Sequence, residues 1–131
     1  MAAKCMDLRK IKRGTLERER DVLHVLNEGG GHPHVIKLLG AEEADDCAYL
    51  MLTLCEGGDL LTKLEEAGDA KFTEAHARGI AAQLISALTH LHDLGIAHRD
   101  IKAENCMCID DAPHLPGHVK FADERGLVSI Q

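Results

Sequence analysis

Aromatic residues are scarce in this 131-residue sequence, which has no tryptophan, one tyrosine and two phenylalanines. Aliphatic residues and alanine must therefore fill the core, because residues of the apolar classes still make up 45% of the chain. This length and this content predict one domain, or part of one, with a thin hydrophobic core.

Long apolar runs are missing as well. No stretch approaches the roughly 18 apolar residues of a membrane-spanning helix, and the N-terminus lacks the apolar core of a signal peptide. We therefore expect a soluble protein with no membrane partner.

Basic charge is in the minority and is spread along the chain. The 15 lysines and arginines stand against 22 aspartates and glutamates, which gives a net charge of -7. No basic stretch is dense enough for a nucleic-acid-binding surface, so no nucleic-acid partner is expected.

The five cysteines are an odd number, scattered along the chain, with no secretory signal ahead of them. This pattern favours free thiols in a reducing compartment over a framework of disulfides. It indicates an intracellular, cytoplasmic location.

The first half of the chain reads as one helix followed by two strands. Thr15 is a candidate N-cap for a helix ending near Leu26, and the glycine-rich stretch after it breaks the helix. The apolar runs 34–40 and 47–55 have strand length, and the acidic residues 41–46 between them predict a turn. The two runs are expected to form an antiparallel pair.

The second half is mainly helical. A short helix is expected over 60–66, and a long helix should run from a Thr73 cap to Gly95. Short strands are expected in the runs "CMCI" and "HVKFA", joined by a turn. The order of elements predicts an α+β fold, with a β-rich part first and a helical part second.

The segment "AHRDIKAEN" follows the long helix and brings a carboxylate, an ammonium and a carboxamide into a single loop. Asp100 can accept a proton from a hydroxyl, Lys102 can neutralise charge on a transferred group, and the Asn105 oxygen suits magnesium. Taken singly, each of these residues is as well explained by a polar surface loop. Taken together in this order, they indicate phosphoryl transfer.

This segment resembles the catalytic loop of eukaryotic protein kinases. The matching residues are His98, Arg99, Asp100, Ile101, Lys102 and Asn105. The resemblance implies that Asp100, Lys102 and Asn105 are catalytic, and that His98 is structural and packs beneath the loop. Lysine at position 102 resembles the serine/threonine branch of the family.

Further motifs follow in kinase order. "MAAK" resembles the V-A-I-K motif, so that Lys4 would hold the α- and β-phosphates of ATP and Glu19 would be its partner on the following helix. "HPHVIKLLG" and "AYLMLTLCEGGDL" resemble the fourth strand and the fifth strand with the hinge. The remaining implied positions are Leu52 as gatekeeper, Thr53 and Cys55 at the adenine edge, Asp59 at the ribose, Met107 under the adenine and Asp123 as a magnesium ligand.

The resemblance implies a truncated, two-lobed protein-kinase-like fold with ATP and Mg²⁺ as cofactors and a protein with a Ser/Thr hydroxyl as substrate. Residues 1–54 would be a remnant small lobe with the start of the hinge, and residues 55–131 the start of the large lobe. The amino-acid sequence of the hinge segment is similar to that of the calcium/calmodulin-dependent-kinase-like group. The oligomeric state is left open.

Three features depart from the family pattern. No glycine-rich loop precedes the third-strand motif, and the sequence stops before any activation segment. "DERG" stands where D-F-G is expected, with Glu124 in place of the phenylalanine and Arg125 inserted. A carboxylate in that apolar slot would cost several kcal/mol, which puts the aim of Asp123 in question.

These departures suggest a truncated or misassembled reading frame, a hypothesis that the full-length transcript would test. The 131-residue chain itself is expected not to phosphorylate protein at a measurable rate. The alternative function is a catalytically inactive, pseudokinase-like binding or regulatory module.

Single motifs also have simpler interpretations. The "HPH", "HLH" and "CMC" segments lack the paired spacing of a zinc site, so no metal role is assigned to them. Lys4 alone would be read as a surface charge. Asp59 could simply cap the helix that follows it.

Overall fold

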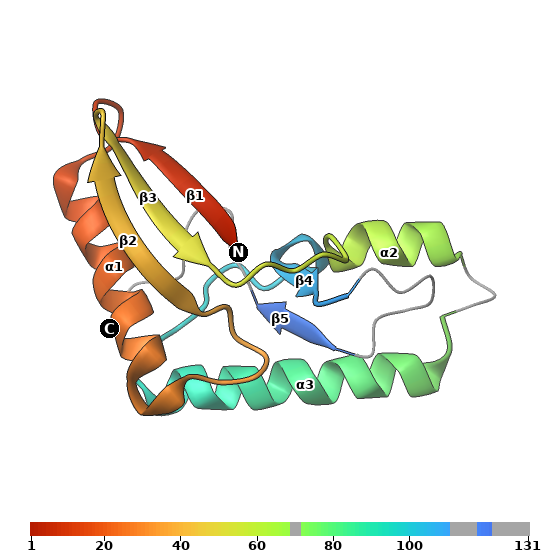
Figure 1. The fold of residues 1–131 in the computed structure, drawn as a ribbon. Coiled ribbons are helices and arrows are strands. Elements are labelled where there is room, and N and C mark those ends of the chain that lie inside the picture. The colour runs from red at the N-terminus through yellow and green to blue at the C-terminus, as the bar shows by residue number, and fades with distance from the viewer. Residues whose placement is uncertain (69–71, 111–117, 122–131) are drawn as a thin grey trace.

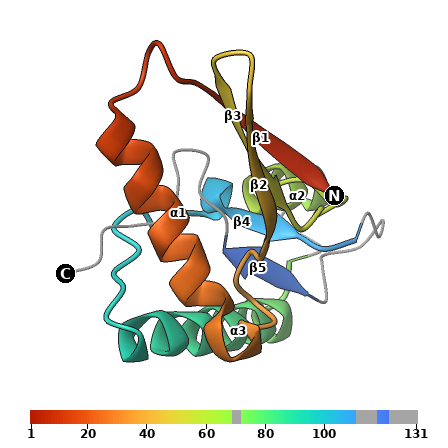
Figure 2. The same cartoon turned by 60° about the vertical axis from the view of Figure 1, so that its left-hand side comes forward.

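The computed structural model describes residues 1–68, 72–110 and 118–121. Its first part is a three-stranded antiparallel sheet with one helix beside it (Figure 1). The elements of this part are β1 (Ala2–Asp7), α1 (Arg13–Asn27), the short 3₁₀ helix η1 (Glu28–Gly30), β2 (Leu38–Ala44) and β3 (Cys47–Leu52). Figure 2 shows α1 running alongside the sheet.

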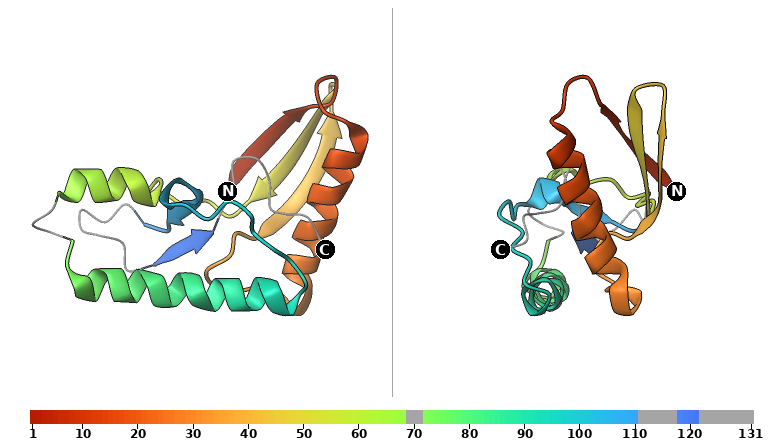
Figure 3. Two further views of the ribbon diagram at one scale, coloured as in Figure 1. Left: turned by 180° about the vertical axis from the view of Figure 1, so that it is seen from behind. Right: turned by 90° about the vertical axis from the view of Figure 1, so that its left-hand side faces the viewer.

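The second part is mainly helical. Its elements are α2 (Leu60–Ala67), α3 (Glu74–Asp93), the 3₁₀ helix η2 (Ala103–Asn105), β4 (Cys106–Cys108) and β5 (Val119–Phe121). The β4–β5 hairpin lies between α2 and α3, as the views from the front and from behind both show (Figures 1 and 3). The expected α+β fold, with its β-rich part first, is confirmed.

The three-stranded sheet has the order β1-β3-β2, so β3 is central. Lys4 of β1 lies opposite Leu50 of β3, and Ala41 of β2 lies opposite the other side of Leu50. Leu50 is only 1% exposed. The middle of the sheet is therefore anchored in the core, while its acidic edge strand β2 faces solvent.

The strand expected over 34–40 was wrong. Only the end of this run belongs to β2, which continues through the acidic residues 41–44, where the sequence predicts a turn. The turn itself is reduced to Asp45 and Asp46, both at positive φ (51° and 59°), as a two-residue hairpin of type I′ requires. Val35 instead pairs with Phe121 of β5 in an isolated parallel bridge: the Ile36 N–H donates to the Phe121 carbonyl, and the Phe121 N–H donates to the His34 carbonyl. This bridge joins the two parts of the molecule.

The expected N-cap of α1 was also wrong. The helix begins at Arg13 with Lys12 in the cap position, and Thr15 lies inside the first turn, where its N–H donates to the Lys12 carbonyl over 2.8 Å. Lys12 makes no side-chain capping bond. Helix α1 is held chiefly by its buried face, which includes Leu16 and Val22, because packing outweighs a local cap signal.

The caps of the two later helices are confirmed. Thr73 Oγ1 accepts a hydrogen bond from the His76 N–H over 3.3 Å, and the two residues form a capping box at the start of α3. The Asp59 carboxylate accepts a bond from the Thr62 N–H over 2.9 Å at the start of α2. Both contacts satisfy backbone donors that a helix leaves unpaired.

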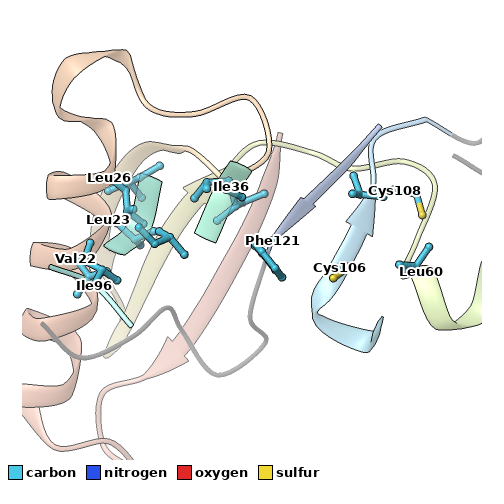
Figure 4. Packing of buried hydrophobic residues seen from close by; sticks show 14 of the residues in the cluster. Val22, Leu23, Leu26, Ile36, Leu60, Ile96, Cys106, Cys108 and Phe121 are labelled. Atoms are coloured by element: carbon cyan, nitrogen blue, oxygen red, sulfur yellow. The ribbon is translucent and has the colours of Figure 1, made fainter. Parts of the chain in front are cut away.

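One core runs through both parts of the molecule (Figure 4). It is aliphatic apart from Phe121 and two cysteines, as the composition predicted. Phe121 is fully buried, and so are Leu91 of α3 and Ile96 after it, to within 1%. Within the residues that the structure describes, no helix has the length and apolar content needed to cross a membrane.

Candidate active site

An ion pair links the sheet to helix α1. Lys4 Nζ lies 2.7 Å from Glu19 Oε1, and the two side chains are 20% and 8% exposed. Side chains alternate along β1, so Lys4 faces α1, while Glu19 shares the buried helix face with Leu16 and Val22. A charged residue this buried is stable only with a partner, and Lys4 is that partner.

The loop after α3 gathers three of the expected catalytic residues. The buried Asn105 side chain donates from Nδ2 to the Asp100 carbonyl (2.7 Å) and to Asp100 Oδ2 (3.0 Å). Lys102 Nζ lies 3.5 Å from the same carboxylate oxygen. A carboxylate, a cation and a carboxamide are thus held close together within residues 100–105.

His98 supports this loop from below. Its side chain is 3% exposed, and its ring centroid lies 4.9 Å from that of Phe121. The Asp100 N–H donates to the His98 carbonyl (2.9 Å), and His98 Nδ1 lies 3.3 Å from the same nitrogen. Arg99 between them has a positive φ of 60°, a conformation that costs energy in a non-glycine residue. The core contact of His98 therefore helps to hold a strained loop in place.

A cleft of about 480 Å³ opens where the two parts of the molecule meet. This volume lies within the range of small-molecule sites, about 300–1,000 Å³. Its walls come from β1, the end of β3 with the segment after it, and the η2–β4 segment. The lining residues are Ala2, Ala3, Lys4, Ile36, Leu52, Thr53, Leu54, Cys55, Glu104 and Met107.

Five of the expected site residues line this cleft: Lys4, Leu52, Thr53, Cys55 and Met107. The catalytic-loop residues do not line it, but they adjoin it, since Glu104 in its wall precedes Asn105. Asp59 also stands outside the lining and caps α2, as the simpler interpretation proposed. Asp123 and the "DERG" segment fall outside the residues that the structure describes.

The sequence analysis did not identify five residues of the cleft wall, which are Ala2, Ala3, Ile36, Leu54 and Glu104. Ala2 could have been found, because residues two apart on a strand face the same side and Lys4 was already assigned. Glu104 could also have been suspected, although less strongly, because it is the neighbour of Asn105 in the sequence. Ile36 and Leu54 gave none, since their position depends on how the two parts of the molecule meet.

The segment after β3 is fixed closely against β4. The Gly57 N–H donates to the Cys108 carbonyl over 3.1 Å, and a Cβ atom at Gly57 would stand 2.0 Å from the Asp110 carbonyl oxygen. Asp59 and Met107 form an isolated antiparallel bridge in the same region. Glycine at position 57 therefore allows the close backbone contact between the segment after β3 and the segment 108–110.

Two side chains near the cleft have shifted acidities. Hydrogen bonds from the backbone and side chain of Thr62 lower the pKa of the Asp59 carboxyl, which keeps it ionised. Burial raises the pKa of the Cys55 thiol, which keeps it protonated in the cleft wall.

A small sheet with a helix, a helical part and a cleft where they meet define a two-lobed fold of the kinase type. The family model "Protein kinase domain" matches residues 1–124. The chain belongs to the protein kinase family.

Known relatives share parts of this chain. CBL-interacting protein kinase 22 of rice (Oryza sativa subsp. japonica) is 43% identical over 95 residues, 72% of this chain and 21% of the relative. Human ribosomal protein S6 kinase alpha-2 is 39% identical over 105 residues, 80% of this chain and 13% of the relative.

A solved structure shares the fold. The crystal structure of Rad53 residues 1–466 in complex with AMP-PNP has a TM-score of 0.77 and 32% identity, and it covers 92% of this chain. The chain corresponds to only 30% of that structure, so it spans less than a third of each of these three proteins.

Proposed function

We propose that this chain is part of a serine/threonine protein kinase domain that binds ATP with magnesium. In the complete domain, the γ-phosphate of ATP would be transferred to the hydroxyl of a protein substrate. The Lys4–Glu19 ion pair beside the cleft carries this proposal, because a buried carboxylate aims the lysine where phosphate charge must be offset. Family membership supports it.

The adenine of ATP would occupy the apolar end of the cleft. Leu52 would stand behind the ring as gatekeeper, and Met107 would pack beneath it. The Thr53 N–H is already used, because it donates to the Lys37 carbonyl over 3.0 Å. We therefore assign the adenine-edge contacts to the Thr53 carbonyl and the Cys55 backbone.

Asp59 would bind the ribose hydroxyls. Its carboxylate already accepts bonds from the Thr62 N–H and from Thr62 Oγ1 (2.8 Å). A carboxylate has about four acceptor sites, so capping α2 and binding a ribose are compatible. Its lowered pKa keeps it an acceptor.

The catalytic loop would carry the chemistry. Asp100 would orient the substrate hydroxyl and accept its proton as the hydroxyl oxygen bonds to the γ-phosphorus and the bond to ADP breaks. Lys102 would offset charge on the transferred group, and Lys4 would hold the α- and β-phosphates. General-base assistance of this kind contributes roughly 10² to 10⁴ in rate.

Asn105 suits a magnesium ligand. Its amide nitrogen is directed at Asp100, so its side-chain oxygen is the group left to face a hard cation. Asp123 is proposed as the second ligand. Magnesium, when bound, would offset the charge of the phosphate oxygens.

The proposed boundary between lobes falls between residues 54 and 55, with 1–54 as small-lobe remnant and 55–131 as start of the large lobe. In the described residues, no observation favours the alternative of an inactive binding module. The calcium/calmodulin-dependent-like subgroup stays part of the proposal.

Thermal unfolding with and without magnesium and ATP tests the proposal. Ligand at 100 times its dissociation constant should stabilise the chain by about 2.7 kcal/mol. Lys4→Met should abolish the shift, whereas Lys10→Met, at an exposed lysine remote from the cleft, should retain it. Equal shifts in both variants would contradict the assignment of Lys4.

A further inference from the structure

Two cysteines lie together on the face of the sheet that points away from Lys4. In the β1–β3 register, Cys5 is opposite Tyr49, and Asp7 is opposite Cys47. Residues two apart on a strand share a face, so the Cys5 and Cys47 side chains are diagonal neighbours. Cys5 is exposed and Cys47 is partly exposed.

The pKa of Cys47 reflects this proximity. The side chain of Cys5 is the main cause that raises the pKa of the Cys47 thiol. Tyr49 stands beside both thiols, and their charges raise the pKa of its hydroxyl.

The other cysteines are in different surroundings. Cys106 and Cys108 are buried, and burial raises the pKa of each thiol to about 11. Cys55 lies in the cleft wall, where burial also raises its pKa. Cys5 is therefore the one thiol of the five that is classed as exposed, and Cys47 is its neighbour.

We propose that Cys5 and Cys47 form a reversible oxidation site that reacts with hydrogen peroxide. The Cys5 thiolate attacks a peroxide oxygen and becomes a sulfenic acid, with release of one water. The Cys47 sulfur then attacks the Cys5 sulfur, the sulfur–oxygen bond breaks, and a second water leaves. Two thiols lose two protons and two electrons, and hydrogen peroxide takes them up to become two waters.

The resulting disulfide would be strained. Diagonal Cα atoms in an antiparallel pair lie about 7–8 Å apart, whereas ordinary disulfides join Cα atoms about 4.4–6.8 Å apart. Closing the bond therefore needs the two strands to approach by about an ångström near Cys5. Such a bond is readily reduced, so a dithiol should reverse it.

Peptide mapping of the peroxide-treated chain tests the proposal. Trypsin leaves Cys47 and Cys55 in one peptide, so the experiment is best done in a Cys55→Ser background. After treatment with a small excess of hydrogen peroxide and capping of free thiols, we expect a Cys5–Cys47 linked peptide that dithiothreitol removes. The same treatment in concentrated urea should spread the linkages over other cysteine pairs.

Single variants separate the two steps. Cys47→Ser should leave Cys5 as a sulfenic acid that dimedone traps, and Cys5→Ser should leave Cys47 largely reduced. Circular dichroism of both near-isosteric variants checks that they fold like the parent. Full capping of both thiols after peroxide in the folded chain, or a linkage pattern equal to that in urea, would overturn the proposal.

Discussion

Asn105 Nδ2 donates to Asp100 Oδ2 over 3.0 Å, and also to the Asp100 backbone carbonyl over 2.7 Å. A buried carboxamide thus fixes both the side chain and the backbone of the proposed base. The same contacts orient Asn105 itself, so each residue depends on the other for its position.

Removing this carboxamide should destabilise the chain. Asn105→Leu removes two hydrogen bonds from a part-buried loop, one of them to a carboxylate, which should cost about 1–3 kcal/mol. Urea denaturation followed by circular dichroism measures the loss. Thr89→Val, which removes an exposed side-chain bond to the Ile85 carbonyl, is the control and should change stability far less. Equal losses in the two variants would contradict a special role for Asn105.

The Thr73 cap gives a second stability prediction. Thr73→Ala should lower the free energy of unfolding by about 0.5–2 kcal/mol, because the first turn of α3 loses its side-chain acceptor. Thr73→Ser keeps that oxygen and should stay within a few tenths of a kcal/mol of the parent. Equal losses in Ala and Ser variants would show that the methyl group, and not the cap, matters.

A chain of histidine rings predicts the pH dependence of stability. His32 stacks on His90 of α3 at 5.1 Å and lies 5.5 Å from His34, and His34 stacks on His118 at 6.2 Å. Burial, followed by the charges of His90, His34 and Lys120, lowers the pKa of His32. Its neutral ring accepts or donates a 3.0 Å bond with Ser86 Oγ of α3.

The lowered pKa of His32 sets the direction in which stability changes with pH. The unfolded chain binds a proton to His32 near pH 6.5, while the folded chain does so only at a lower pH. The contribution to stability is therefore complete above pH 6.5 and is lost as the pH falls from there through the folded pKa. Urea denaturation at pH 7.5, 6.5 and 5.5 should show this loss.

Variants assign that pH dependence to the ring. His32→Gln should flatten the change between pH 7.5 and pH 5.5, while His24→Gln, at an exposed histidine of α1, should retain it. An unchanged slope in His32→Gln would mean that other groups titrate.

Gly57 gives a packing prediction. Gly57→Ala should prevent the close backbone contact with Asp110, since the added Cβ would lie 2.0 Å from a carbonyl oxygen. Gly58→Ala meets no neighbour but has a φ of +71°, so it tests backbone strain alone. We expect a much larger fall in melting temperature for Gly57→Ala. Similar falls would show that packing at Gly57 is not tight.

Much of this fold could be predicted from local signals. The caps at Asp59 and Thr73 are short-range patterns, and the spacing of Lys4 and Glu19 needs only one strand, one turn and one helix. The strand prediction for 34–40 was wrong because the start of this apolar run is buried by contact with β5, some 85 residues further on, and not by strand pairing nearby. The prediction of Thr15 as N-cap was wrong because the packing of α1 on the sheet determines where the helix begins.

Among the cleft residues, too, some could be predicted from local motifs and others could not. Lys4, Leu52 and Met107 were found from motifs, each within a few residues of a recognisable signal. Ile36 and Leu54 could not be found in this way, because they line the cleft only once the sheet and the helical part meet.

Titration of isotope-labelled chain with magnesium and ATP, followed residue by residue by NMR, tests the central claim most directly. We predict the largest amide shifts at residues 2–4, 52–55 and 104–107, and none on the outer sheet face around Tyr49. Saturable shifts elsewhere with these three segments unchanged would contradict the account of a nucleotide held between Lys4 and the catalytic loop.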